Sequence, residues 1–74
     1  MEKILKVDFL LAFGENIKKI RISQGVTQKS LAFDCNMEPA SMNRIECGKV
    51  NTSVYTLRLI CGSLGIQSNL LFQV

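Results

Sequence analysis

Apolar residues recur along the chain at spacings of three and four, which places them on one side of a helix. The first such stripe consists of Leu10, Phe13, Ile17 and Ile20. Asp8 is a candidate N-cap for this helix, and Gly25 is a candidate for its end. Gly14 lies inside the stripe, where glycine weakens a helix by about 1 kcal/mol relative to alanine.

A second, shorter helix is predicted over residues 28–35. Thr27 is a good N-cap because its hydroxyl can accept a hydrogen bond from a backbone N–H of the first turn. The inward positions of this helix are Leu31, Ala32 and Cys35. Asn36 tolerates the left-handed backbone conformation with which many helices end, so the helix is expected to stop there.

A third helix is predicted over residues 39–47. Pro39 suits its first turn, because the N–H that proline lacks would have no partner there. Met42 and Ile45 face inward, and Gly48 is expected to end the helix.

A fourth helix begins after Thr52 or Ser53, either of which can cap it, and Gly65 closes it. Its inward residues are Leu57, Ile60, Cys61 and Leu64. Residues 68–74 add one short helical turn. Because no segment alternates with period two for long, the chain is predicted to be all-α, a compact bundle of four to five helices.

The two middle helices are joined by only three residues, Asn36, Met37 and Glu38. A connection this short forces a large crossing angle between the helices instead of an antiparallel hairpin. This arrangement is the helix-turn-helix, in which the second helix can lie in the major groove of DNA. The sequence therefore predicts such a unit at about residues 28–47.

Two segments of this unit resemble a known family. They are GVTQKSLA at residues 25–32 and MNRIECGK at residues 42–49, followed by a helix that runs from Thr56 to Ile66. Over residues 16–71 the chain is similar to Cro/C1-type (XRE family) helix-turn-helix proteins. The resemblance implies a lambda-repressor-like fold and binding to double-stranded DNA.

The resemblance also implies roles for individual residues. Gln28 matches a position that contacts phosphate and supports a base-reading side chain, and Lys49 matches a phosphate-contacting loop position. Arg21 and Glu46 match a pair that forms a structural salt bridge between the first and third helices. The predicted DNA-binding set is Thr27, Gln28, Pro39, Ala40, Ser41, Asn43, Arg44 and Lys49.

The chemistry of these side chains agrees with the implied roles. Arg44 has the planar fork that grips guanine O6 and N7 together, and Asn43 can present a bidentate edge to adenine. Pro39 and Ala40 offer no hydrogen bonds to bases, so direct readout falls on Ser41 and its two polar neighbours, with Ala40 against a thymine methyl.

Two residues depart from the family pattern. Asn36 stands where glycine is usual in the turn, and Glu38 stands where a small hydroxyl cap is typical. Glu38 caps poorly, although its charge suits a helix N-terminus. Against DNA, its carboxylate would repel phosphate or select a cytosine amino group.

Each functional role has a plainer structural alternative. Lys18, Lys19 and Lys29 form either a solvated face or a set of phosphate contacts. Gln28 is either a phosphate contact or a local cap partner, and Arg44 is either a DNA contact or an inert surface residue. Phe33 lies outside the inward stripe of the second helix, so it either folds over the first helix or belongs to an interface.

Length and composition narrow the class of protein. Seventy-four residues allow a single domain, 1–74, with a thin core. The net charge is only +3, but residues 16–33 contain no acid and none follows Glu46, so the charge around the unit is locally basic. The chain has no histidine, and its three cysteines match no metal-ligand spacing, so no metal, cofactor or catalytic function is expected.

The three cysteines, Cys35, Cys47 and Cys61, are instead expected as small apolar residues in a reducing cytoplasm. The apolar stretch 4–13 contains Lys6 and Asp8 and is too short and too charged for a signal peptide or a membrane span.

Both ends of the chain are richer in apolar residues than a domain of this size needs. The surplus residues are Ile4, Leu5, Val7, Phe9, Leu11, Leu70, Leu71, Phe72 and Val74. Some are expected to close the core, and the rest are a candidate dimer surface. An N-terminal arm at 1–8 and the segment 68–74 are therefore expected at the interface of a homodimer, whose two recognition helices would contact two half-sites.

Three functions follow from these features. The favoured one is a sequence-specific, repressor-like transcriptional regulator that binds DNA as a homodimer. The alternative is a protein-interaction module on the same fold, either an antitoxin with a toxin partner or an adaptor, which the weak hydrogen-bonding capacity of Pro39 and Ala40 favours. An enzyme is not expected, because no base accompanies the one conceivable nucleophile, Cys47.

Overall fold

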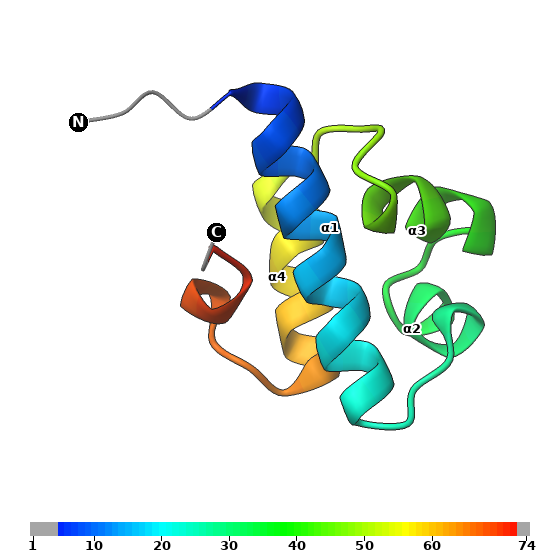
Figure 1. The fold of residues 1–74 in the computed structure, drawn as a ribbon. Helices are drawn as coiled ribbons and strands as arrows, with labels where there is room; N and C mark the ends of the chain where they lie inside the picture. The colour runs from blue at the N-terminus through cyan, green and yellow to red at the C-terminus, as the bar shows by residue number, and fades with distance from the viewer. Residues whose placement is uncertain (1–4, 73–74) are drawn as a thin grey trace.

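A computed structural model describes residues 5–72 of the chain. The helices are α1 (Lys6–Ser23), α2 (Gln28–Asp34), α3 (Pro39–Glu46) and α4 (Val54–Leu64), followed by a short 3-10 helix, η1 (Ser68–Phe72). The described residues contain no strand, which confirms the all-α prediction. In Figure 1, α2 and α3 lie together on one side of the long α1, and η1 lies on the other side.

Two of the helices begin at the caps that the sequence predicts. The Thr27 side-chain oxygen accepts a hydrogen bond from the Ser30 backbone N–H at 3.0 Å, at the start of α2. At the start of α4 the cap is Ser53, whose oxygen accepts from the Thr56 N–H at 3.1 Å. Glu38 precedes α3 without a side-chain cap bond, as expected from its chemistry.

The start of α1 differs from the prediction. The helix begins at Lys6 after an extended Leu5, so Asp8 lies in the first turn and is not the cap. A carboxylate there still favours the helix, because it faces the positive end of the helix dipole. Of the arm predicted over residues 1–8, residues 6–8 are thus helical, and residues 1–4 lie outside the described part of the chain.

All four helices end with the same backbone motif. In α2, the Asn36 N–H bonds to Phe33 O and the Met37 N–H bonds to Ala32 O, while Asn36 adopts a φ of 56°. This double closure satisfies carbonyls that the helix leaves free. Gly25, Gly48 and Gly65 adopt the same left-handed backbone conformation at the ends of α1, α3 and α4. Because Cys35 and Cys47 are C-caps, α2 and α3 each end one residue earlier than predicted.

Helices α1 and α3 approach each other closely at two glycines. A Cβ on Gly14 would lie 2.5 Å from the carbonyl oxygens of Ile45 and Glu46. A Cβ on Gly48 would lie 2.8 Å from the Cα of Leu11. Gly14, which the sequence marks only as a weak point in a helix, is therefore a packing requirement of this contact.

The core forms where the helices meet, and both ends of the chain contribute to it. Its fully buried large side chains are Ile17, Leu31, Met42, Ile60 and Leu71. The ring of Phe13 stacks on Phe9 at 5.9 Å and on Phe72 at 5.7 Å between centroids. Phe9, which the stripe of α1 omits, is half-buried and packs against the core. The predicted stripe residue Leu10 is half-buried as well, but it is not among the residues packed against the buried cluster.

Candidate nucleic-acid interface

Helix α3 has one buried face and one exposed face. Its buried residues are Met42, Ile45 and Glu46. The exposed face of α3 is defined by Pro39, Ala40, Asn43 and Arg44, and Ser41 beside it is half-buried. The structure therefore places four of the predicted base-contacting residues on one surface.

A buried ion pair joins α3 to α1. The Arg21 Nε of α1 lies 2.8 Å from Glu46 Oε2, and its Nη2 donates to Glu46 Oε1 at 3.0 Å. The Arg21 Nη1 also donates to the carbonyl oxygen of Val26, at 2.9 Å, in the turn before α2. One guanidinium therefore links α1 to α3, as the resemblance implies, and it also bonds the turn before α2.

Gln28 extends this ion pair toward the surface. Its Nε2 donates to Glu46 Oε1 at 3.2 Å and to Asn43 Oδ1 at 3.3 Å. The Cys47 Sγ lies 3.9 Å from the same Asn43 oxygen. Gln28 is thus hydrogen-bonded to Asn43, a predicted base-contacting residue. Within residues 5–72 its side chain caps no backbone group. Sequence reasoning missed that this residue is Asn43, because the contact joins two helices.

The remaining predicted contacts are also exposed. Lys49 is exposed just after the left-handed Gly48, and Lys29 is exposed on α2. Thr27 is exposed as well, and its hydroxyl oxygen serves as the cap of α2. Phe33 is 80% exposed, so it does not fold over α1.

The cysteines show no sign of a metal centre. Within residues 5–72, no three His, Cys, Asp or Glu side chains are grouped so that they could hold a metal ion. Burial raises the pKa of the Cys61 thiol, and burial together with the charge of Asp34 raises the pKa of Cys35. Both thiols are therefore inert apolar residues at neutral pH. Within the same residues, no helix has the length and apolar character needed to cross a bilayer.

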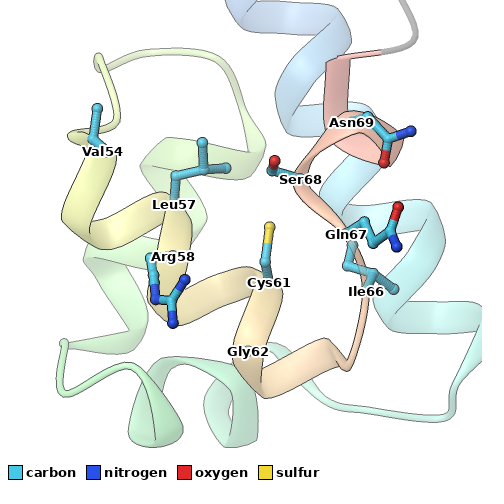
Figure 2. A pocket seen from close by; sticks show the side chains of 9 residues that line it. All are labelled: Val54, Leu57, Arg58, Cys61, Gly62, Ile66, Gln67, Ser68 and Asn69. Atoms are coloured by element: carbon cyan, nitrogen blue, oxygen red, sulfur yellow. The ribbon is translucent and has the colours of Figure 1, made fainter.

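A groove lies between α4 and the segment that leads into η1, away from α3. Its volume is about 710 Å³, and Figure 2 shows the side chains that line it. The apolar part of the lining comes from Val54, Leu57, Cys61 and Ile66. No feature of the sequence predicts this groove, because its two walls are brought together only by the turn after α4.

Two short helices, α2 and α3, that are joined by a tight turn and pack on each other, with Asn43 and Arg44 exposed on the second, are typical of a helix-turn-helix DNA-binding domain. Residues 17–71 match the family HTH_3, described as helix-turn-helix. The chain therefore belongs to this family. The resemblance to XRE-type proteins is confirmed, and DNA-binding regulation of transcription is the function that the family and its relatives support.

Two relatives are named as a control protein and as an immunity repressor. The chain is 34% identical over 58 residues to the control protein C.BamHI of Bacillus amyloliquefaciens, a match that covers 77% of this chain and 72% of that protein. It is 37% identical over 57 residues to the immunity repressor protein of Bacillus phage phi105, over 77% of this chain but only 40% of the repressor.

A solved structure shares the fold. The restriction-modification controller protein C.AhdI from Aeromonas hydrophila superposes with a TM-score of 0.82 at 27% identity. The match covers 85% of this chain and 96% of the controller protein. The arrangement of α1 to α4 is therefore shared with a restriction-modification controller protein.

Proposed function

We propose that the protein is a repressor-like regulator that binds a short, nearly palindromic DNA duplex as a homodimer, with α3 in the major groove. The observation that carries this proposal is the exposed face of α3, where Asn43 and Arg44 lie above the buried Arg21–Glu46 pair. A side chain that reads bases must be held in place before it meets DNA, and the ion pair supplies that rigidity. Such a regulator acts in the cytoplasm, and no catalytic role is part of the proposal.

The residues divide into base contacts and phosphate contacts. Arg44 is the bidentate donor to guanine, Asn43 and Ser41 make further polar contacts, and Ala40 meets a thymine methyl. Pro39 contributes surface contact only. Phosphate contacts come from Thr27, Lys49 and Gln28, the last through its backbone N–H in the first turn of α2, because its side-chain amide is already bonded to Glu46 and Asn43.

Selection of bound duplexes from a random pool tests the function. A nearly palindromic sequence should be enriched, and its affinity should fall steeply with salt, because each neutralised phosphate releases a counterion. If no sequence is enriched, the protein is not a sequence-specific regulator, and the antitoxin or adaptor alternative gains support. The names of the relatives give that alternative no support.

The Arg44→Ala variant tests the base contact directly. We expect it to cost about 1–3 kcal/mol of binding free energy and to relax the preference at one base position. The matched control is Arg58→Ala, an exposed arginine on α4 away from α3, with both variants measured on a half-site duplex so that dimerisation does not affect the comparison. The control should keep the base preferences. Equal losses on every sequence would assign Arg44 to a phosphate instead.

The second copy is proposed to dock on the side of the molecule that carries the groove. That side presents exposed apolar side chains at the start of α4, Val54 at 84% and Tyr55 at 69% exposure. From η1 it adds Leu70 and Phe72, which are 41% and 44% exposed. Figure 1 shows η1 across α1 from α2 and α3, so docking there leaves both recognition helices free for DNA.

A further inference from the structure

The direction of the hydrogen bonds between Glu46 and Asn43 limits what Asn43 can recognise. Glu46 is an ionised carboxylate paired with Arg21, so it can only accept hydrogen bonds. Its Oε1 lies 3.2 Å from the amide of Gln28, which must therefore present its NH₂ group to it. The orientation of the Gln28 amide is thus fixed by charge.

The orientation of the Gln28 amide in turn fixes the orientation of the Asn43 amide. The Gln28 Nε2 has two hydrogens, and the second one points to Asn43, at 3.3 Å. A donor requires an acceptor, so the Asn43 group that faces it is Oδ1. The Cys47 thiol approaches this oxygen as well, at 3.9 Å, which engages both of its lone pairs.

The Nδ2 group of Asn43 is therefore the end that DNA meets. Asn43 is exposed, and no group among residues 5–72 accepts a hydrogen bond from its Nδ2. In the major groove, guanine presents two acceptors, N7 and O6, whereas adenine presents an acceptor next to an amino group. A bidentate contact to adenine needs the asparagine oxygen, which the protein already uses.

We propose that the chain Glu46–Gln28–Asn43 turns Asn43 into a donor-only side chain that selects guanine over adenine. Gln28 acts here as a positioning residue, and its bonds set the specificity of a neighbour. This inference rests on the proposed function, since it requires α3 to lie in the major groove. It replaces the adenine contact that the sequence alone indicates for Asn43.

Selection from a random duplex pool with matched variants tests the inference. The Asn43→Ala variant identifies the base position that Asn43 contacts, because the preference there alone should disappear. At that position the wild-type protein should bind guanine roughly tenfold more tightly than adenine. The Gln28→Leu variant frees Asn43 Oδ1, so the ratio should fall to about twofold or less. Gln24→Leu, at an exposed glutamine whose amide bonds to the Leu64 carbonyl oxygen at 2.8 Å, should leave the ratio unchanged.

The possible results separate this inference from the proposed function. Loss of a Gln28 phosphate contact would weaken binding to all sequences equally and would not alter the ratio. Adenine at the Asn43 position, or an unchanged ratio in Gln28→Leu, would overturn the inference while the regulator proposal stands. Enrichment of no sequence by the wild-type protein would overturn both.

Side-chain amide exchange gives a second test that needs no variant. By NMR on the folded wild-type protein, the hydrogens of Gln28 Nε2 should exchange with water more slowly than those of Asn43 Nδ2. The reverse order would show that Asn43 donates inward, and it would overturn the proposed bond direction even if Gln28→Leu failed to fold.

Discussion

Gly14 shows how a single residue can be unfavourable locally and necessary in the fold. Within α1 it weakens the helix, yet the carbonyl oxygens of Ile45 and Glu46 occupy the space that a side chain would need. We expect Gly14→Ala to reduce the free energy of unfolding by about 2–3 kcal/mol, because α1 and α3 must move apart to admit the methyl group. Chemical denaturation measures this loss.

Gly62→Ala is the control for the Gly14 experiment. Gly62 also lies inside a helix, α4. Apart from its chain neighbours and the backbone of its own helix, no atom lies within 4 Å of the place that its Cβ would take. The intrinsic preference for alanine should then stabilise the protein by up to about 1 kcal/mol. Equal effects of the two substitutions would contradict the close α1–α3 contact.

The three thiols should differ in their reactivity. Cys47 is exposed, whereas Cys35 and Cys61 are buried. Burial raises the pKa of both buried thiols, so the folded state holds their protons more tightly than the unfolded state does. Their contribution to stability is therefore complete near neutral pH and is lost as the pH rises through the folded pKa values.

Labelling followed by peptide mapping checks the thiol prediction. At neutral pH a thiol reagent should modify Cys47 first, and the two buried cysteines only as fast as the fold opens. Above about pH 9 the free energy of unfolding should fall, and the fall should be smaller in a Cys35→Ala variant. Rapid labelling of Cys35 in the native state would show that the core is open there.

At the scale of the elements, the Arg21–Glu46 pair is a buried ion pair that joins α1 to α3. Arg21→Met leaves the Glu46 carboxylate buried without its partner, so we expect a loss of about 3–5 kcal/mol in the free energy of unfolding. The double variant Arg21→Met/Glu46→Leu removes both charges and should recover much of that loss. Denaturant unfolding of the three proteins measures the effect, and a double variant no more stable than Arg21→Met would contradict this account.

Helix boundaries were predictable from the sequence, whereas the packing roles of some residues were not. Thr27, Ser53 and Asn36 were predictable as helix boundaries because a cap or a left-handed turn depends on a few neighbouring residues. The roles of Phe9 and Gly14 were not, because they depend on Phe72 and on the backbone of α3, which lie far away in the sequence.

The candidate site divides in the same way. The helical period places Asn43 and Arg44 on one exposed face, and the sequence alone supports that placement. The direction in which Asn43 presents its amide depends on Gln28 and Glu46 from other parts of the fold. The exposure of a predicted contact residue therefore follows from the sequence, whereas its hydrogen-bonding partners require the structure.

At the scale of the whole molecule, two exposed apolar surfaces are candidates for joining the two copies of the proposed dimer. The groove side and the exposed Phe33 on α2 are rival surfaces, and they lie on different helices. A dimer through Phe33 would place its contact on the helix-turn-helix itself. A dimer through the groove side leaves both α2 and α3 uncovered, which favours the groove side for a protein that must place two recognition helices on one duplex.

Two substitutions by glutamate distinguish these surfaces. Val54 is 84% exposed and is the first residue of α4, where a carboxylate suits the helix dipole, so Val54→Glu should preserve the fold. We expect Val54→Glu to be monomeric by sedimentation equilibrium at concentrations where the wild-type protein is a dimer. Phe33→Glu should remain a dimer. Because two linked half-sites bind far more tightly than one, the monomeric variant should also lose most of its affinity for the full palindrome but not for a half-site. The opposite pattern would place the dimer contact on α2.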